Sequence, residues 1–404
     1  MEAVTPVVSF AGAFALGTIF AVLGAVKLHL SEILQVDDAQ YGRLISTLMF
    51  ASMIALLIIG PLQDTLGFAP IAIVAFAASG GCLWILASAK SYKAALVAAA
   101  LLGIGAMCAS VTGSALGPAV LFDGENPALA QNVINVFFGL GAFLTPYLVG
   151  KLMHSMGYRK TVSIIGGIVF VPIVLVFISS FPQPTADFEI ARTIGLLGTG
   201  YVIFGGLALF CYVGLEASMG GFVSTYLKDQ KLTDEQANKG LAGFWIALIV
   251  GRILASILLI VTGLEPQYQA PIMPVLGLLA IGSITLMVVA KTPKAGVTGT
   301  LLTGLIFGPI FPMVVGVTQF KSASIEAGIA GSVFSWIFAI GLLGATLVPM
   351  LVGKLSAQAT IRQSMKAAVA IAVALVVFSA ILWLAVPDAD PGQIVEVVAT
   401  AAGQ

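Results

Sequence analysis

Long apolar stretches dominate the chain. A helix needs about 20 apolar residues to cross roughly 30 Å of hydrocarbon, and eleven stretches of that length contain no charged residue. A twelfth, 240–264, is interrupted only by Arg252. The runs are unbroken rather than alternating, which excludes barrel strands, so we predict an all-α integral membrane protein with twelve transmembrane helices. The uncharged stretches are 3–26, 44–63, 65–89, 94–122, 126–150, 161–186, 193–215, 266–290, 295–320, 327–353 and 367–387.

Composition agrees with a membrane protein. Apolar residues make up 59% and charged residues 9% of the chain, too few charges to cover a soluble surface. Eighteen basic residues balance eighteen acidic ones, so no net field indicates a nucleic-acid partner. The histidines and cysteines are scattered, so we expect no metal site, cofactor or disulfide framework; they are His29, His154, Cys82, Cys108 and Cys211.

The sequence repeats itself at corresponding positions of two halves. Residues 146–152 read Pro-Tyr-Leu-Val-Gly-Lys-Leu, and residues 349–355 differ from them at one position only. The pattern Asp-x-Gln-x-x-base occurs at 38–43 and again at 234–239. Gly-rich apolar helices can match by chance, but two matches at equivalent spans favour an internal repeat.

The repeat predicts a division into two six-helix halves with pseudo-two-fold symmetry. We place the N-terminal half at 1–180, a linker between the halves at 181–193, and the C-terminal half at 194–404.

Polar residues in spans 5, 7 and 8 carry a family resemblance. Residues 212–216 read Tyr-Val-Gly-Leu-Glu, span 8 carries Trp245 and then Gly-Arg at 251–252, and residues 132–142 read Asn-Val-Ile-Asn-Val-Phe-Phe-Gly-Leu-Gly-Ala. With the six-plus-six repeat, these segments resemble the fucose–proton symporter family of the major facilitator superfamily. The resemblance implies a secondary transporter that works by alternating access.

Some family positions differ here. The family usually has an Asp in span 1 and a Glu in span 4, and this chain has neither; Phe138 replaces a sugar-contacting Asn. The superfamily's loop motif between spans 2 and 3 is kept as Gly60, Asp64 and Gly67, without its basic residues. The resemblance therefore implies the fold and this gating loop, but not the family's proton relay.

Ionisable residues inside the membrane are functional candidates by default. Arg252 lies mid-span, so it must face a partner or a wet cavity; it either lines the substrate site or belongs to a structural ion pair. Lys27 lies near the end of span 1, where it either contacts substrate or extends to the interface.

Glu216 is the candidate for proton coupling, because a carboxyl group buried in the membrane can take up a proton. The alternative is an interfacial Glu that stays solvated or pairs with Lys228. Gly214, Gly220 and Gly221 surround it, and we predict that span 7 is bent or broken there.

Neutral polar groups are the candidates for sugar binding. Asn132 and Asn135 lie one turn apart, and amides both donate and accept hydrogen bonds, as hydroxyl groups require. Trp245 and Trp336 could pack against a sugar's apolar face, and the resemblance adds Tyr212. The alternatives are interhelical hydrogen bonding for Asn and interface anchoring for Trp.

We predict a transporter, not an enzyme, that moves a monosaccharide or related polar metabolite with protons, as a monomer in the lipid bilayer. The alternative within transport is an organic-anion transporter or an efflux or antiport carrier, favoured by two cations, Lys27 and Arg252, against one acid. A nontransporting receptor or a membrane enzyme is the remote alternative, because no acids or histidines cluster for catalysis.

Two arguments about orientation conflict. The resemblance implies an inner or plasma membrane protein with cytoplasmic termini, since the Gly60–Gly67 loop is cytoplasmic throughout the superfamily. That orientation leaves two basic loop residues inside, Arg192 and Lys321, and fifteen outside, against the positive-inside rule. We predict cytoplasmic termini; the alternative is insertion with the termini outside.

Overall fold

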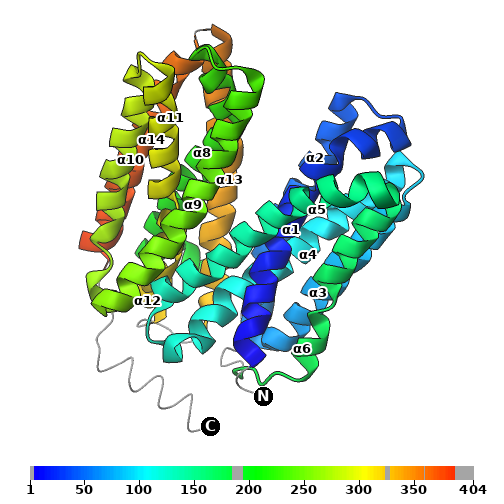
Figure 1. The fold of residues 1–404 in the computed structure, drawn as a ribbon. Coiled ribbons are helices and arrows are strands. Elements are labelled where there is room, and N and C mark those ends of the chain that lie inside the picture. The colour runs from blue at the N-terminus through cyan, green and yellow to red at the C-terminus, as the bar shows by residue number, and fades with distance from the viewer. Residues whose placement is uncertain (1–3, 184–193, 324–327, 359, 387–404) are drawn as a thin grey trace. The chain divides into compact units, whose positions relative to one another are not determined.

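The computed structural model describes residues 4–183, 194–323, 328–358 and 360–386 (Figure 1). Most of these residues are helical and none lies in a strand, and eleven helical stretches are long and apolar enough to cross a membrane. The difference from twelve arises at Pro127–Phe177, which covers two predicted spans in one nearly continuous helical stretch, with a break in helical geometry at Gly157. The predicted all-α membrane fold is confirmed.

The helices form two compact units. The N-terminal helices are α1 (Thr5–Leu34), α2 (Asp38–Leu66), α3 (Phe68–Ser88), α4 (Tyr92–Val120), α5 (Pro127–Phe170) and α6 (Ile173–Phe177). The C-terminal helices are α8 (Gly200–Asp229), α9 (Asp234–Thr262), α10 (Ile272–Val289), α11 (Pro293–Phe307), α12 (Ile310–Ala323), α13 (Ala330–Gln358) and α14 (Ile361–Leu384). Short 3-10 turns are η2 (Phe122–Gly124), η3 (Leu196–Gly198) and η4 (Pro266–Tyr268).

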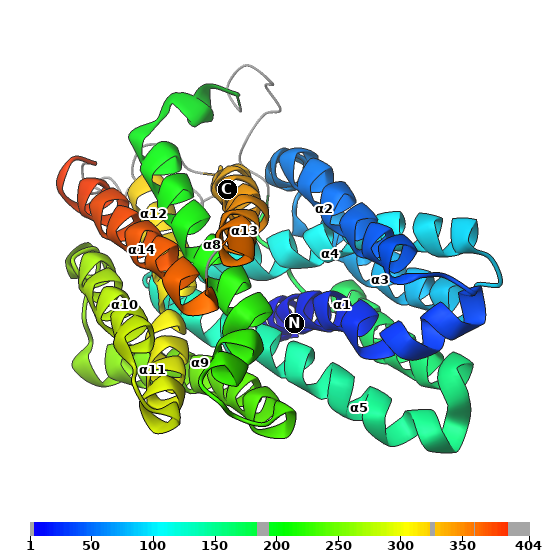
Figure 2. The ribbon, with the colours of Figure 1, turned by 90° about the horizontal axis from the view of Figure 1, so that it is seen from above.

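Among the described residues, contacts assign 4–124, 134–183 and 328–335 to unit 1, and 125–133, 194–323, 336–358 and 360–386 to unit 2. Within unit 2, α14 lies beside α8 and α10 (Figure 2). Of the predicted linker 181–193, residues 184–193 lie outside the described residues, so the predicted boundaries stay a prediction.

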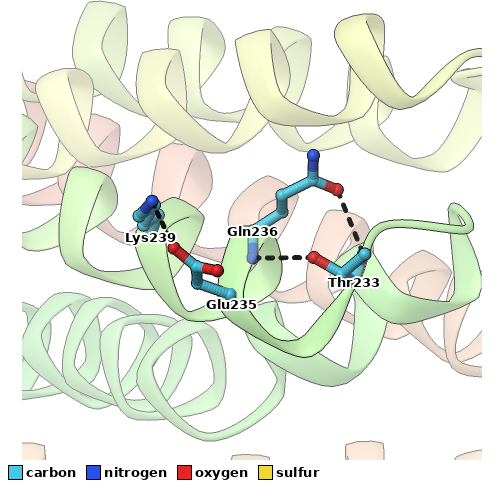
Figure 3. Close-up of polar contacts among 4 residues, drawn as sticks. All are labelled: Thr233, Glu235, Gln236 and Lys239. Carbon is cyan, nitrogen blue, oxygen red and sulfur yellow. Dashed lines mark hydrogen bonds and ion pairs between the residues drawn. The ribbon is translucent and has the colours of Figure 1, made fainter.

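The repeated Asp-x-Gln pattern marks equivalent helix starts. In α9, the Thr233 hydroxyl accepts a hydrogen bond from Gln236 N at 3.3 Å, and Gln236 Oε1 accepts from Thr233 N at 3.1 Å (Figure 3). In α2, Asp37 and Gln40 make the same reciprocal pair. Each capping box satisfies two backbone N–H groups that a helix start leaves without partners, which explains why both halves carry Gln at this position.

Glycines let the helices approach closely at equivalent points of the two units. In unit 1, a side chain on Gly141 of α5 would clash with the carbonyl oxygen of Phe14 in α1. In unit 2, a side chain on Gly344 of α13 would clash with the carbonyl oxygen of Phe210 in α8. Small residues at such crossings are typical of membrane helices, which associate through close packing.

The predicted break in span 7 is wrong, because α8 is one continuous helix from Gly200 to Asp229, and the predicted bend stays a prediction. Two of its glycines serve packing instead. A Cβ on Gly214 would meet the Val348 side chain and the Gly344 carbonyl oxygen, and the ring of Trp245 covers Gly220. Glycine costs about 1 kcal/mol of helix propensity, but neighbouring helices support this helix.

The outer faces of the helices are apolar, as a lipid environment requires. On α9, Leu254, Leu258 and Val261 are 52%, 61% and 78% exposed, and their spacing puts them on one face. A soluble protein rarely exposes a continuous apolar face of this kind.

Candidate functional site

Arg252 and Glu216 form a buried ion pair in unit 2. Arg252 Nη2 lies 3.7 Å from Glu216 Oε1, and the two side chains are 2% and 17% exposed. Arg252 Nε also donates a hydrogen bond to the carbonyl oxygen of Gly308 at 3.2 Å. The partner that the sequence required for Arg252 is therefore Glu216, which comes from the neighbouring helix α8.

Backbone contacts position Arg252 against Gly308. A Cβ on Gly251 would clash with the carbonyl oxygen of Leu305, and a Cβ on Gly308 would clash with that of Leu248. Helix α9 therefore lies directly against the point where α11 ends and α12 begins. The Gly308 carbonyl, close to that helix break, can accept the arginine's hydrogen bond.

The two charges depend on each other. Burying a charge away from water is costly unless it is paired and hydrogen-bonded, and Arg252 has both a counter-ion and a carbonyl acceptor. Glu216 is the more exposed partner of the two. A change in its charge would remove the counter-ion of the arginine.

Aromatic rings extend away from this pair. Tyr212 lies one turn before Glu216 on α8 and interacts electrostatically with both Glu216 and Arg252. Its hydroxyl group makes no hydrogen bond within the described residues. Its ring lies 5.7 Å from that of Phe307 and 6.3 Å from that of Phe311, between centroids. Phe244 touches both Phe307 and Trp245, which continues the series of rings along α9.

Most of these phenylalanines were missed by sequence reasoning, because Phe is common throughout apolar helices. Phe338, on α13, touches Phe311 at 5.5 Å between centroids, and nothing in its local sequence distinguishes it.

The positions of unit 1 that correspond to Glu216 and Arg252 are not charged. The capping glutamines Gln40 and Gln236 lie 196 positions apart (236 − 40), and so do Phe14 and Phe210, whose carbonyls face equivalent glycines. At the same offset Glu216 corresponds to Phe20, and Arg252 to Leu56. The repeat is therefore structural, and the charged pair belongs to one half.

The amide residues of α5 fall on either side of a unit boundary. Asn132, in unit 2, is fully buried and donates to the carbonyl oxygen of Ala128 in its own helix at 2.9 Å. Its Oδ1 atom has no hydrogen-bond partner among the described residues. Asn135, in unit 1, is 7% exposed. The side-chain oxygen of Asn132 can therefore accept a hydrogen bond from a hydroxyl group.

The remaining candidates lie in separate places. Lys27 is half-buried in the last third of α1, in unit 1, and Trp336 is half-buried in α13, in unit 2. Trp245 is 38% exposed and covers Gly220 of α8. The structure therefore brings Glu216, Arg252 and Tyr212 together within unit 2. Trp245 lies at the far end of the series of aromatic rings that begins at Tyr212.

The loop motif at 60–67 has a clear structural role within unit 1. Asp64 accepts hydrogen bonds from Gly331 N at 2.8 Å, Ser332 N at 2.7 Å and Ser332 Oγ at 2.5 Å. It thereby caps the first turn of α13, where an anion is favoured. A Cβ on Gly60 would clash with the same turn, and Gly67 takes a positive φ of 81° between α2 and α3.

Comparison with known protein families identifies the family of this chain. The family model described as Major Facilitator Superfamily matches residues 8–345. The chain belongs to the Major Facilitator Superfamily. The resemblance found in the sequence is confirmed at the level of the superfamily, and with it the multi-pass membrane character of the chain.

A curated relative and two solved structures are similar to the chain. A glucose/galactose transporter of Brucella abortus is 24% identical over 251 residues, which cover 57% of this chain and 58% of the relative, so the match spans little more than half of that protein. The E. coli fucose:proton symporter has a TM-score of 0.76 at 17% identity and covers 94% of this chain and 99% of its own. A proton:xylose symporter has a TM-score of 0.75 at 13% identity, covering 99% and 98%.

These structures share the fold. Their coverage extends over both units, which supports the predicted architecture of twelve helices in two halves.

Proposed function

We propose that the protein is a secondary active transporter that moves a monosaccharide or related polar metabolite by alternating access, together with protons. The Glu216–Arg252 pair carries this proposal, because it places a carboxylate and a guanidinium together in a buried position of unit 2. The relative is named a glucose/galactose transporter, and the similar structures are titled as symporters of fucose or xylose with protons.

Proton coupling follows from the mutual dependence of the pair. When Glu216 takes up a proton, Arg252 loses its counter-ion and its side chain can bind an oxygen-rich solute instead. When the solute leaves, the arginine again favours the ionised carboxylate. Proton and solute then load together, which is the requirement for symport.

A neutral solute fits better than an anion. Asn132 offers a neutral acceptor, and the exposed ring of Trp245 offers an apolar face. Asn135, Trp336 and Lys27 complete the proposed substrate-binding set, with Tyr212 beside the ion pair.

Uptake by proteoliposomes tests the proposal. Purified protein would be given labelled glucose, galactose, fucose and xylose, each with and without an acidic exterior. We expect accumulation of at least one sugar that increases with the proton gradient. Accumulation of sugar acids or sugar phosphates, with none of the neutral sugars, would support the organic-anion alternative instead.

We also propose that the protein lies in the cell membrane, acts as a monomer, and has both termini in the cytoplasm. The orientation rests on the superfamily's loop motif at Gly60, Asp64 and Gly67, against the charge bias of the loops.

A further inference from the structure

Basic residues gather at one end of unit 1, where α3 ends and where α5 continues after its break in helical geometry. Lys90, Arg159 and Lys160 are exposed there and form this basic cluster. Residues 65–122 and 126–186 contain five lysines and arginines but no acid. The segments that carry the basic cluster therefore supply no carboxylate to neutralise it.

Two hydrogen bonds join these parts of α3 and α5. The Tyr158 hydroxyl donates to the carbonyl oxygen of Leu86 at 3.1 Å, and Trp84 Nε1 donates to that of Ser163 at 3.0 Å. Leu86 lies in the last turn of α3, and Tyr158 directly follows the break in α5. The members of the basic cluster therefore lie at the same end of one helix pair.

Trp84 lies about one turn from the basic cluster along α5. The residue is 40% exposed, and its N–H group is already used by Ser163. Its ring lies 5.1 Å from that of Phe170, between centroids, and a Cβ on Gly166 would lie 3.0 Å from the indole. A fixed tryptophan with one open face is typical of the level where hydrocarbon meets lipid headgroups. The basic cluster therefore lies at headgroup height.

An apolar surface continues from this level into the membrane. Lys160, Ile164 and Ile168 are spaced four residues apart, which puts them on one face of α5, and both isoleucines are exposed. On α3, Ile85 is exposed beside Trp84. Exposed cations, an indole ring and aliphatic side chains thus follow one another along the surface. A phospholipid has the complementary order of phosphate, ester region and acyl chains.

The corresponding end of unit 2 is built differently. Arg362 lies 203 positions after Arg159 (362 − 159), the offset of the two repeated Pro-x-Leu-Val-Gly-Lys-Leu segments (349 − 146). Its Nε atom donates to the carbonyl oxygen of Val288, near the end of α10. At the same offset Trp84 corresponds to Met287, which is fully buried. The combination of free-standing cations with an exposed tryptophan therefore belongs to unit 1.

We propose that Lys90, Arg159 and Lys160 bind the headgroup of an anionic phospholipid, whose acyl chains lie against Trp84 and the isoleucines of α5. Lysine and arginine form charge-assisted hydrogen bonds with phosphate oxygens, and basic clusters between membrane helices suit anionic headgroups. A zwitterionic lipid fits less well, because its ammonium group would meet three cations and no carboxylate from these segments. This site is separate from the proposed transport function.

Quenching of Trp84 fluorescence by brominated lipids measures the binding. A chain with Trp245→Phe, Trp336→Phe and Trp383→Phe keeps Trp84 as its sole tryptophan. It would be reconstituted with brominated phosphatidylglycerol or brominated phosphatidylcholine in an unbrominated phosphatidylcholine bilayer. We expect phosphatidylglycerol to quench Trp84 at the lower mole fraction.

Arg159→Ala should reduce this preference about fivefold, the contribution of one cation beside an anionic membrane surface. Arg43→Ala is the matched control, because Arg43 is exposed near the start of α2 in the same unit and its loss changes the net charge equally. The control should keep the preference. Arg159→Lys keeps the charge and should also keep most of it, which separates lipid binding from damage to the fold.

Equal quenching by the two brominated lipids would overturn the site, and so would equal losses in Arg159→Ala and Arg43→Ala. Inorganic phosphate provides a further test. If it abolishes the preference where sodium chloride of the same ionic strength does not, the cations bind a free phosphate ion rather than a lipid. Quenching needs no solute, so absence of sugar uptake would contradict the transport proposal without affecting this result.

Discussion

Two ion pairs in unit 2 show how environment decides what a charge contributes. Lys239 Nζ lies 2.6 Å from Glu235 Oε1, but these side chains are 74% and 77% exposed (Figure 3). Arg252 and Glu216 are farther apart, at 3.7 Å, yet nearly buried. Exposed ion pairs contribute little to the stability of the fold. Removing one member of a buried pair, in contrast, leaves the other charge buried without a counter-ion.

Arg252→Ala should therefore lower the free energy of unfolding by about 3 kcal/mol or more, while Lys239→Ala should leave it unchanged within error. Thermal unfolding of the two purified variants in detergent measures the difference.

Arg252→Lys should keep the charge and the fold but lose the planar geometry of the guanidinium, and so cut transport strongly. Normal transport by a folded Arg252→Ala variant would remove this residue from the site.

Glu216→Gln should separate coupling from binding. The amide has a similar size and cannot release a proton, so pH-driven accumulation should be lost while exchange of labelled for unlabelled solute continues. Both are measured in proteoliposomes with and without a pH gradient. A variant that still accumulates solute in response to pH would assign coupling to another residue.

At the scale of helices, glycine is required for close packing at one position and not at another. Gly344 of α13 touches the backbone of α8, so a methyl group there would force two helices apart. Gly221 of α8 has open space around it. The close approach of membrane helices, rather than flexibility, explains the first glycine.

Gly344→Ala should destabilise the protein by about 1–3 kcal/mol through overpacking. Gly221→Ala should be neutral or stabilise α8 by up to about 1 kcal/mol, because alanine is the better helix former. The two melting temperatures in the same detergent give the comparison. Similar melting temperatures for both variants would contradict the close contact of α8 and α13.

For the whole molecule, the open question is the direction of insertion. The two ends of α9 face opposite sides of a membrane that it crosses, so the flanking residues Asp229 and Glu265, both exposed, report on opposite sides. Single-cysteine variants at these positions, in a chain without Cys82, Cys108 and Cys211, would be treated in intact cells with a membrane-impermeant thiol reagent.

With cytoplasmic termini, Asp229→Cys should label in intact cells and Glu265→Cys only after lysis. The reverse pattern would show that the basic loops face the cytoplasm, and that the positive-inside rule outweighs the superfamily's usual orientation.

Local features could be predicted from the sequence because their physics is local. Runs of about 20 apolar residues mark helices that cross a bilayer, and the glutamines at 40 and 236 mark capped helix starts. The repeat exposed the two-half design, and the polar residues of spans 5, 7 and 8 indicated the superfamily. Arg252 and Glu216 could each be singled out, because charges within apolar runs are conspicuous.

Only the tertiary structure decided which faces of the helices pack against one another. These helices are apolar almost all round, so periodicity does not tell which side of a helix faces its neighbours. The pairing of Glu216 with Arg252, the continuity of α8, and the contacts of Asp64 with α13 all depend on how helices are rotated and tilted against each other. Close packing at small residues sets that arrangement, and such packing joins residues that lie far apart along the chain.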